Sequence, residues 1–397
     1  MRATCLRTAV LALLAVLSSG CGGGSAPTPA PKPTPSCTPA SPPAFAYVLD
    51  DYANTVSMYT MNSCTGDLIP TVPATVATGA NNFGSEQMVV DPAGRFAYVA
   101  NLMSNAEDEA TISMFTINPS TGVLTPTIPA TVPTGFLPQG IGIDPSGKFV
   151  YTANSDDNTV SMFTINQTTG VLTPTTPPAV STLADVSTGL YSSPVAVIVD
   201  PSGRFAYAVN EDDATVSMFT INPTTGILTP TTPATVFTGP IPFGIAVDPS
   251  GKFAYVPNND SGGEMTYGVS QYTINSVTGV LTQNTPAAVA AGNGPTSVAI
   301  DPSSKYAYVV NRQDDTVSMF TIDSSTGNLT PNTPAIIATG EEPFRIVVDP
   351  SGEFAYVVNE GGTVSIYALN SDGTLTAAGT VTNGGTPVSM AITGTSQ

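Results

Sequence analysis

The chain has 397 residues and a formal net charge of −19, because acidic residues outnumber basic ones 29 to 10. Binding to nucleic acid or to anionic lipid needs a basic surface, so this balance excludes both kinds of partner. The chain contains no His, which excludes a Ser-His-Asp triad and a His-ligated zinc. Any catalysis must therefore use carboxylates, arginines, tyrosines or a bound metal.

The amino terminus is typical of an export signal. Arg2 and Arg7 precede an apolar stretch at residues 9–17, which is shorter than the roughly 20 residues that span a bilayer. The segment ends in Leu-Ser-Ser-Gly-Cys at Cys21, which resembles the cleavage box of bacterial lipoproteins. We expect residues 1–21 to be a lipoprotein signal peptide and Cys21 to carry the lipid. Ordinary signal cleavage beside an unrelated Cys stays open as the alternative.

Residues 22–44 are rich in Gly and then in Pro, Ala and Thr, a composition typical of an extended tether. We therefore expect a protein of the bacterial cell envelope, outside the cytoplasm, that is held on the outer membrane or cell surface by its lipid alone. Cys37 and Cys64 are the other two cysteines after Cys21. In an oxidising compartment such a pair favours a disulfide, so we predict a Cys37–Cys64 bridge.

One β-type unit recurs along residues 45–397. Its best copies read Asp-Pro-Ser-Gly, then Phe-Ala-Tyr-Val-x-Asn, a short acidic loop, Thr-Val-Ser-Met-Phe-Thr-Ile-Asn, a Thr-Gly turn and a Pro-rich stretch. A period near 50 residues with no helical pattern is typical of propeller blades. The aromatic residues that open the second strand of each unit are Phe45, Phe96, Phe149, Phe205, Phe253, Tyr306 and Phe354.

Each unit predicts a four-stranded blade. Short apolar runs such as residues 244–247 suit an innermost strand, and the Pro-rich stretches suit an outermost edge strand. The first copy, at Phe45, lacks an inner strand, whereas the last copy ends on one at residues 387–392. We therefore predict an all-β, seven-bladed β-propeller of four-stranded blades, closed by the carboxyl-terminal strand joining the amino-terminal blade.

The second-strand motif resembles the Tyr-Val-Thr-Asn repeat of surface propellers. It stands at residues 98–101, 151–154, 207–210, 308–311 and 356–359. With the Asp-Pro-Ser-Gly and Thr-Gly turns, it is similar to the lactonase-type seven-bladed propellers, a family that includes 6-phosphogluconolactonase-like enzymes. The resemblance implies the fold and a possible lactonase activity, but its motif residues are turn and packing residues, so no catalytic residue is carried over.

The loops between second and third strands are strongly acidic, and they share one face with the loops that enter each inner strand. Their acidic pairs indicate either turn residues on a solvated surface or a ring that attracts Ca²⁺, although no loop has calcium-loop spacing. The candidate metal-binding residues are Asp156, Asp157, Asp212, Asp213, Asp314 and Asp315. Apart from this possible Ca²⁺, we expect no cofactor.

Two bases depart from the repeat. Arg312 follows a second strand, and Arg345 opens the next inner strand, where the other copies have uncharged residues. Glu341 and Glu342 precede Arg345 in the same loop. Arginines beside carboxylates could bind a lactone and activate water, so these four are the candidate catalytic residues. A structural Arg–Glu pair is the alternative.

Three functions follow from these features. We favour a monomeric, lipid-anchored propeller that binds a protein or carbohydrate without catalysis. The alternatives are a lactonase that hydrolyses a sugar lactone and an envelope structural protein that binds divalent cations.

Overall fold

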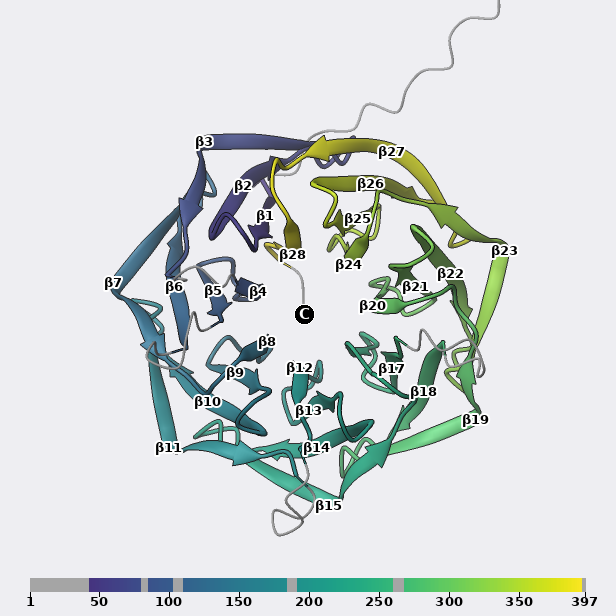
Figure 1. The fold of residues 1–397 in the computed structure, drawn as a ribbon, viewed down its shortest axis with the longest axis horizontal. Coiled ribbons are helices and arrows are strands. Elements are labelled where there is room, and N and C mark those ends of the chain that lie inside the picture. The colour runs from purple at the N-terminus through teal and green to yellow at the C-terminus, as the bar shows by residue number, and fades with distance from the viewer. Residues whose placement is uncertain (1–42, 80–84, 103–109, 184–190, 260–267, 395–397) are drawn as a thin grey trace, which may run out of the picture. The chain divides into compact units, whose positions relative to one another are not determined.

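The computed structural model describes residues 43–79, 85–102, 110–183, 191–259 and 268–394. In this part of the chain seven four-stranded antiparallel sheets form a ring of blades (Figure 1). The predicted all-β seven-bladed propeller is therefore confirmed. The described residues contain no helix that could cross a membrane.

The innermost strands line the axis of the ring, and the second strands lie directly outside them (Figure 1). The innermost strands, in order around the ring, are β28 (Pro387–Ile392), β4 (Ser85–Val90), β8 (Pro138–Ile143), β12 (Pro194–Val199), β16 (Ala246–Val247), β20 (Pro295–Ile300) and β24 (Pro343–Val348). The second strands are β1 (Phe45–Asp50), β5 (Phe96–Asn101), β9 (Phe149–Asn154), β13 (Phe205–Asn210), β17 (Phe253–Pro257), β21 (Tyr306–Asn311) and β25 (Phe354–Asn359).

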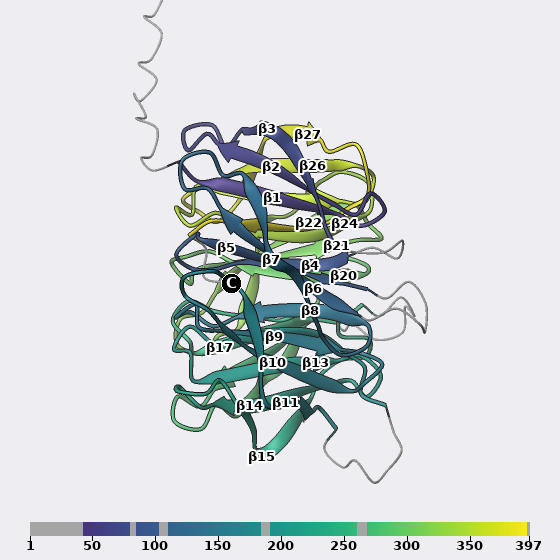
Figure 2. The same cartoon turned by 90° about the vertical axis from the view of Figure 1, so that its left-hand side faces the viewer.

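The third strands follow outward, and the fourth strands form the circumference (Figures 1 and 2). The third strands are β2 (Thr55–Met61), β6 (Thr111–Ile117), β10 (Thr159–Ile165), β14 (Thr215–Ile221), β18 (Val269–Ile274), β22 (Thr316–Ile322) and β26 (Thr363–Leu369). The fourth strands are β3 (Leu68–Ala77), β7 (Leu124–Pro133), β11 (Leu172–Ser181), β15 (Leu228–Phe237), β19 (Leu281–Val289), β23 (Leu329–Ala338) and β27 (Leu375–Thr382).

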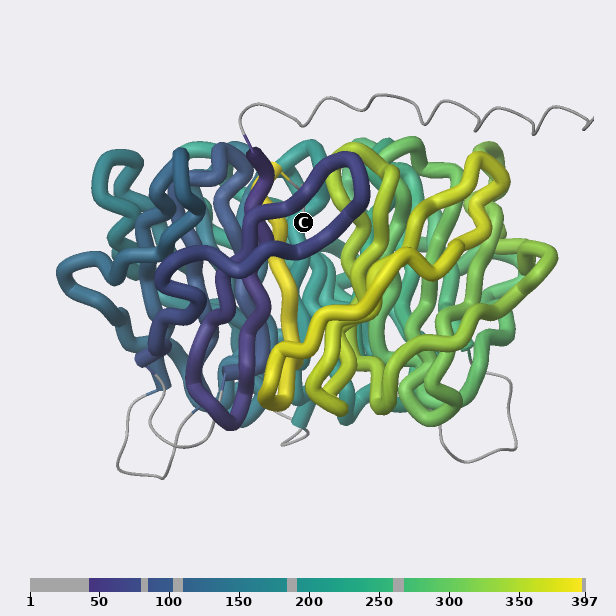
Figure 3. The backbone as a smooth tube through the Cα atoms, turned by 90° about the horizontal axis from the view of Figure 1, so that it is seen from above, coloured from purple at the N-terminus to yellow at the C-terminus, as the bar shows by residue number. Residues whose placement is uncertain are grey.

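The ring closes as predicted. β28 pairs antiparallel with β1, with Tyr47 opposite Ala391 and Leu49 opposite Ser389. Figure 3 shows this last strand, in yellow, beside the first strands, in purple. Because the two ends of the chain complete one sheet, the inner edge of β1 is paired rather than left open at the closure.

One inner strand is shorter than the sequence predicts. We expected residues 244–247 to pair, but β16 contains only Ala246 and Val247. Pro257 occupies the facing position on β17, and its carbonyl accepts a 3.1 Å hydrogen bond from the Phe243 amide. The N–H that a proline lacks would have pointed to the same inner segment of the blade, which leads into β16. The ladder of hydrogen bonds between this segment and β17 is therefore interrupted at Pro257.

The core lies between neighbouring blades. The second strands are buried almost throughout, and Tyr47, Tyr98 and Tyr151 are among the largest fully buried side chains. The Asp-Pro-Ser-Gly turns hold the second strands in place, because the Asp200 carboxylate accepts from the amides of Arg204 and Phe205 at 2.9 and 2.8 Å. The repeated motif residues are therefore used for packing and turns.

The cysteine predictions fall mostly outside the described residues. Cys64, in the turn after β2, is disulfide-bonded. Cys37, its predicted partner, and Cys21, the predicted lipid-bearing residue, lie within residues 1–42, which the structure does not describe. The bridge to Cys37, the signal peptide, the tether and the anchor therefore stay predictions.

Candidate functional site

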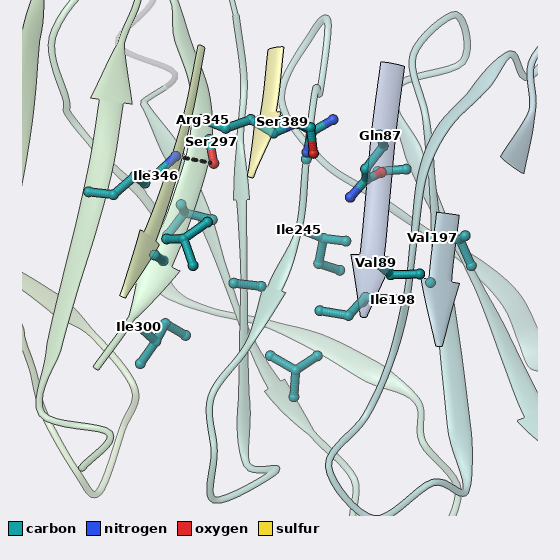
Figure 4. Close-up of a pocket in the computed structure, with 18 of the residues that line it drawn as sticks. Gln87, Val89, Val197, Ile198, Ile245, Ser297, Ile300, Arg345, Ile346 and Ser389 are labelled. Atoms are coloured by element: carbon teal, nitrogen blue, oxygen red, sulfur yellow. Dashed lines mark hydrogen bonds between the residues drawn. The ribbon is translucent and has the colours of Figure 1, made fainter. Parts of the chain in front are cut away.

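A cavity of ≈ 220 Å³ lies in the central channel and is lined by residues of all seven innermost strands. Equivalent positions near one end of these strands hold Gln87, Gly140, Ala196, Gly244, Ser297, Arg345 and Ser389. Arg345, Ser389 and Gln87 appear together at this end of the cavity in Figure 4. This end, which we call the channel mouth, has the polar side chains of the cavity, and among the described residues that line the cavity Arg345 is the charged one.

A β-bulge precedes this position in six of the inner strands. The pairing register shifts, for example, between Ser85 and Gln87 and between Pro343 and Arg345. Bulges redirect side chains and are frequent beside functional sites. The bulge residues are Glu86, Gln139, Val195, Thr296, Phe344 and Val388. Glu86 is the ionisable residue among them.

Arg345 is the predicted catalytic residue that faces the cavity. Its side chain is half-buried, and its Nε is buried without a hydrogen-bond partner. Burial lowers the pKa of Arg345, while the charge of Glu86 raises it. Because guanidinium keeps its charge and its N–H donors in proteins, the side chain of Arg345 can bind an anionic or carbonyl oxygen in the channel.

Glu86 lies near enough to Arg345 for each charge to shift the pKa of the other. The pKa of Glu86 is raised to about 7, chiefly by burial and next by the charge of Asp51, while the charge of Arg345 opposes both effects. Asp51 is held beside this strand, because its Oδ1 accepts a 3.1 Å hydrogen bond from the Ser85 amide. A carboxylate with a pKa near neutrality can take up and release protons at the mouth.

The two predicted arginines meet around one aromatic ring. The guanidinium carbons of Arg312 and Arg345 each lie 5.6 Å from the ring centroid of Phe344. Phe344 in turn packs edge-on against Phe243, with ring centroids 5.4 Å apart. The cation–π contacts fix the position of both guanidinium groups.

Arg312 is neutralised by a carboxylate that the sequence did not single out. Its guanidinium forms an ion pair with Glu360, whose side chain is 14% exposed. Burial raises the pKa of Glu360, and Arg312 lowers it. Arg312 is not among the residues that line the cavity, whereas Arg345 is.

Glu341 and Glu342 are exposed and shape the loop before β24. Their backbone carbonyls accept from the amides of Gly361 and Glu360 at 3.2 and 2.9 Å, and the Glu342 amide donates to Asp315 at 2.8 Å. In the described part of the chain the ion pairs are Arg95–Asp91 and Arg312–Glu360. The carboxylates beside the two arginines are thus Glu360 and Glu86.

The acidic pairs are placed on separate blades. Among the described residues, no group of three or more Asp, Glu, His or Cys side chains could hold a metal ion. Several of the predicted ligands instead hold loops: Asp157 accepts from the Phe136 amide at 2.8 Å, and Asp314 from the Asn293 amide at 2.7 Å. Asp213 accepts from the Thr215 hydroxyl at 2.6 Å, and Asp212 from the Ser193 hydroxyl. Asp156 is exposed.

Sequence reasoning missed Glu86. Most inner strands open with Pro and then an uncharged residue, whereas β4 opens with Ser85-Glu86-Gln87. Aligning the repeats one position before Arg345 would have shown a single charged residue among the seven copies. Its placement beside Arg345, however, depends on the closed ring.

Comparison with known proteins identifies relatives of the same fold. The family model described as "Lactonase, 7-bladed beta-propeller" matches residues 40–187 and 184–343. A candidate 6-phosphogluconolactonase from Bacteroides fragilis superposes with a TM-score of 0.71 at 22% identity, covering 89% of this chain and 98% of that one. The periplasmic gluconolactonase PpgL of Pseudomonas aeruginosa gives a TM-score of 0.69 at 18% identity, over 88% and 99% of the two chains. No curated protein matches the sequence. The resemblance inferred from the repeats is confirmed, and the chain belongs to the lactonase family of seven-bladed β-propellers.

Proposed function

We propose that this protein hydrolyses lactones at the channel mouth. The observation that carries the proposal is that Arg345, which lines one end of the channel cavity, interacts electrostatically with Glu86, whose pKa is about 7 and which stands at the bulge next to the lining residue Gln87. Family membership supports a lactone substrate. The proposal replaces the non-catalytic binding module that the sequence favoured.

The reaction needs a base and an oxyanion partner. Glu86 takes a proton from water, and the resulting hydroxide oxygen attacks the carbonyl carbon of the lactone. The carbonyl electron pair moves to oxygen, where the N–H groups of Arg345 stabilise the negative charge. When the ring C–O bond breaks, the ring oxygen accepts the proton held by Glu86, and the product is a hydroxy acid.

The charges at the mouth favour a lactone without a phosphate. Arg312 is neutralised by Glu360, so Arg345 is the arginine left to meet an anion, and the charge of Glu86, which itself feels Asp51, acts on it. A phosphate carries nearly two negative charges at neutral pH and would be repelled by these carboxylates. The predicted envelope location, which is part of this proposal, also separates the protein from cytoplasmic phosphosugars.

The test is a hydrolysis assay with the mature protein, using γ-butyrolactone, glucono-δ-lactone and 6-phosphogluconolactone. We expect turnover of the two unphosphorylated lactones, a lower kcat/KM for the phosphorylated one, and loss of turnover in Glu86→Gln. Calorimetric binding of a lactone without turnover would instead establish a binding propeller. The rejection of all lactones in both measurements would remove the proposal.

A further inference from the structure

We infer that the substrate is an amphipathic lactone whose aliphatic tail lies in the channel. This inference rests on the proposed function, because it places the lactone ring at Arg345 and Glu86. It differs from a sugar lactone in what must fill the rest of the cavity.

The side chains that line the cavity beyond its mouth are apolar. Ile198, Ile245, Ile300 and Val347 line it and are each partly exposed. In Figure 4 the labelled polar residues gather at one end, with Ile245, Val197, Ile198 and Ile300 beyond them along the channel. A ligand that enters at Arg345 therefore meets aliphatic side chains as it extends inward.

The side-chain oxygens at the mouth already accept hydrogen bonds from the protein itself. Ser389 Oγ accepts from the Met88 amide at 3.3 Å, and Ser297 Oγ from the Ile346 amide at 3.3 Å. Gln87 Oε1 accepts from the Ile141 amide at 3.1 Å. Each of these bonds joins an inner strand to the next blade, so these oxygens are engaged in holding the ring together.

A sugar lactone would have few polar side chains as partners beyond the mouth of this cavity. Each of its hydroxyl groups loses hydrogen bonds to water on entry and needs a replacement. An alkyl tail has no such requirement, and each buried methylene improves binding by about fourfold. The cavity volume of ≈ 220 Å³ is large enough for several water molecules, which suits a short chain.

The lining of the cavity ends at the Asp-Pro-Ser-Gly turns, so a longer tail would gain no further burial there. Pro145, Pro201 and Pro249, from the Asp-Pro-Ser-Gly turns, line the cavity at the end opposite the mouth. We therefore expect the gain per methylene to stop once the tail reaches this level.

The experiment measures kcat/KM of the mature protein for γ-lactones with unbranched side chains of increasing length, beside glucono-δ-lactone. We expect a rise of about fourfold per methylene, then a plateau, with glucono-δ-lactone below the longer alkyl lactones. Val347→Thr, which keeps the side-chain shape and adds a hydroxyl, should reduce the rise, as should Ile245→Asn. Ile128→Asn is the matched control, because Ile128 is 95% exposed, and it should behave as wild type.

A second readout does not depend on turnover. In calorimetry, octanoate should bind more tightly than gluconate, and Val347→Thr should weaken octanoate alone. A flat chain-length series, or a preference for glucono-δ-lactone, overturns the inference while the lactonase proposal stands. If no lactone is hydrolysed, the proposed function fails, and equal binding of octanoate and gluconate would then overturn the inference as well.

Discussion

The hydroxyl of Tyr207 donates a 2.8 Å hydrogen bond to the carbonyl of Gly279, which lies in the Thr-Gly turn of the next blade. The same bond joins Tyr47 to Gly122, Tyr98 to Gly170, Tyr151 to Gly226, Tyr255 to Gly327 and Tyr356 to Gly66. The Tyr-Val-x-Asn and Thr-Gly motifs are therefore two halves of one contact between neighbouring blades.

Tyr308 is the exception, since its buried hydroxyl has no hydrogen-bond partner. In the following blade the turn is one residue shorter: the Gly373 amide bonds to Asn370, three residues back, whereas the Gly226 amide bonds to Asn222, four residues back. In this shorter turn the glycine carbonyl does not lie where the Tyr308 hydroxyl could donate a hydrogen bond to it.

This difference makes a matched pair of variants. We expect Tyr207→Phe to destabilise the protein by about 1–2 kcal/mol, because it leaves the Gly279 carbonyl unsatisfied. Tyr308→Phe should be neutral or slightly stabilising, since it removes an unpaired hydroxyl. Thermal unfolding of both proteins checks this, and an equal loss of Tm would contradict the assignment.

The glycines of the Thr-Gly turns are required for space as well as for backbone conformation. A Cβ on Gly226, which has φ of +73°, would lie 2.3 Å from the Phe149 ring. Gly251, with φ of +69°, has nothing within 4 Å of the same position. Gly251→Ala should therefore cost about 1 kcal/mol, the cost of the left-handed conformation, and Gly226→Ala clearly more. Comparable Tm values for the two variants would show that the blade interface can adjust.

Replacing Arg345 should affect catalysis rather than folding. We expect Arg345→Gln to lower kcat/KM for the lactone substrate by about 100-fold or more, because it removes the charge that stabilises the oxyanion. The Tm should be unchanged or higher, since a half-buried charge with an unpaired Nε is lost. Arg204→Gln is the control, because Arg204 is exposed at an Asp-Pro-Ser-Gly turn and stacks on Phe205 at 5.0 Å. A large loss of Tm with Arg345→Gln would indicate a structural role.

Glu86 should give the hydrolysis rate its pH dependence. Burial raises its pKa to about 7, so the base form accumulates as the pH rises through 7. We expect kcat/KM, corrected for spontaneous hydrolysis, to rise between pH 6 and 8 and then to level off. Glu86→Gln should lose this dependence, while Glu353→Gln, an exposed residue of an Asp-Pro-Ser-Gly turn, should keep it.

A rise in pH should increase the hydrolysis rate through Glu86, but it should decrease the stability of the folded protein through the same carboxyl group. Because its pKa is higher in the folded state than the ordinary value of 4.5, its contribution is fully present below about pH 4.5 and is lost as the pH rises through about 7. Glu86→Gln should therefore be more stable than wild type at pH 8, by about 1–3 kcal/mol, and similar to it at pH 4.5. Thermal unfolding at both pH values tests this. A constant difference in Tm would mean that Glu86 does not titrate in this range.

The anchor prediction depends on Cys21 alone. We expect the wild-type protein to fractionate with membranes and to incorporate labelled fatty acid, and Cys21→Ser to lose both properties while the propeller keeps its Tm. Cys64→Ser, at a cysteine within the propeller, is the control that should keep the lipid label. Labelling of the Cys21→Ser protein would rule out this residue as the attachment point.

Much of the fold could be predicted from the sequence, because each blade repeats its own packing rules. Asp200 accepts hydrogen bonds within its own turn, the Tyr207 hydroxyl donates to the Thr-Gly turn of the next blade, and Gly226 leaves space for the Phe149 ring. All three residues stand in motifs that recur along the chain. The unmatched strand at residues 387–392 was enough to predict the closure. The short length of β16 was not predicted, because it depends on a single proline, Pro257, in the neighbouring strand β17.

The site depended on tertiary structure. The sequence singled out Arg312 and Arg345 as departures from the repeat, but it paired them with Glu341 and Glu342, their neighbours in the chain. Ring closure instead brings Glu86 from near the beginning of the propeller to Arg345 near its end, and the packing of adjacent blades pairs Arg312 with Glu360. A periodic pattern encodes the contacts that every blade makes. The burial that raises the pKa of Glu86 exists at one place on the ring, and it arises once all seven blades have assembled around the channel.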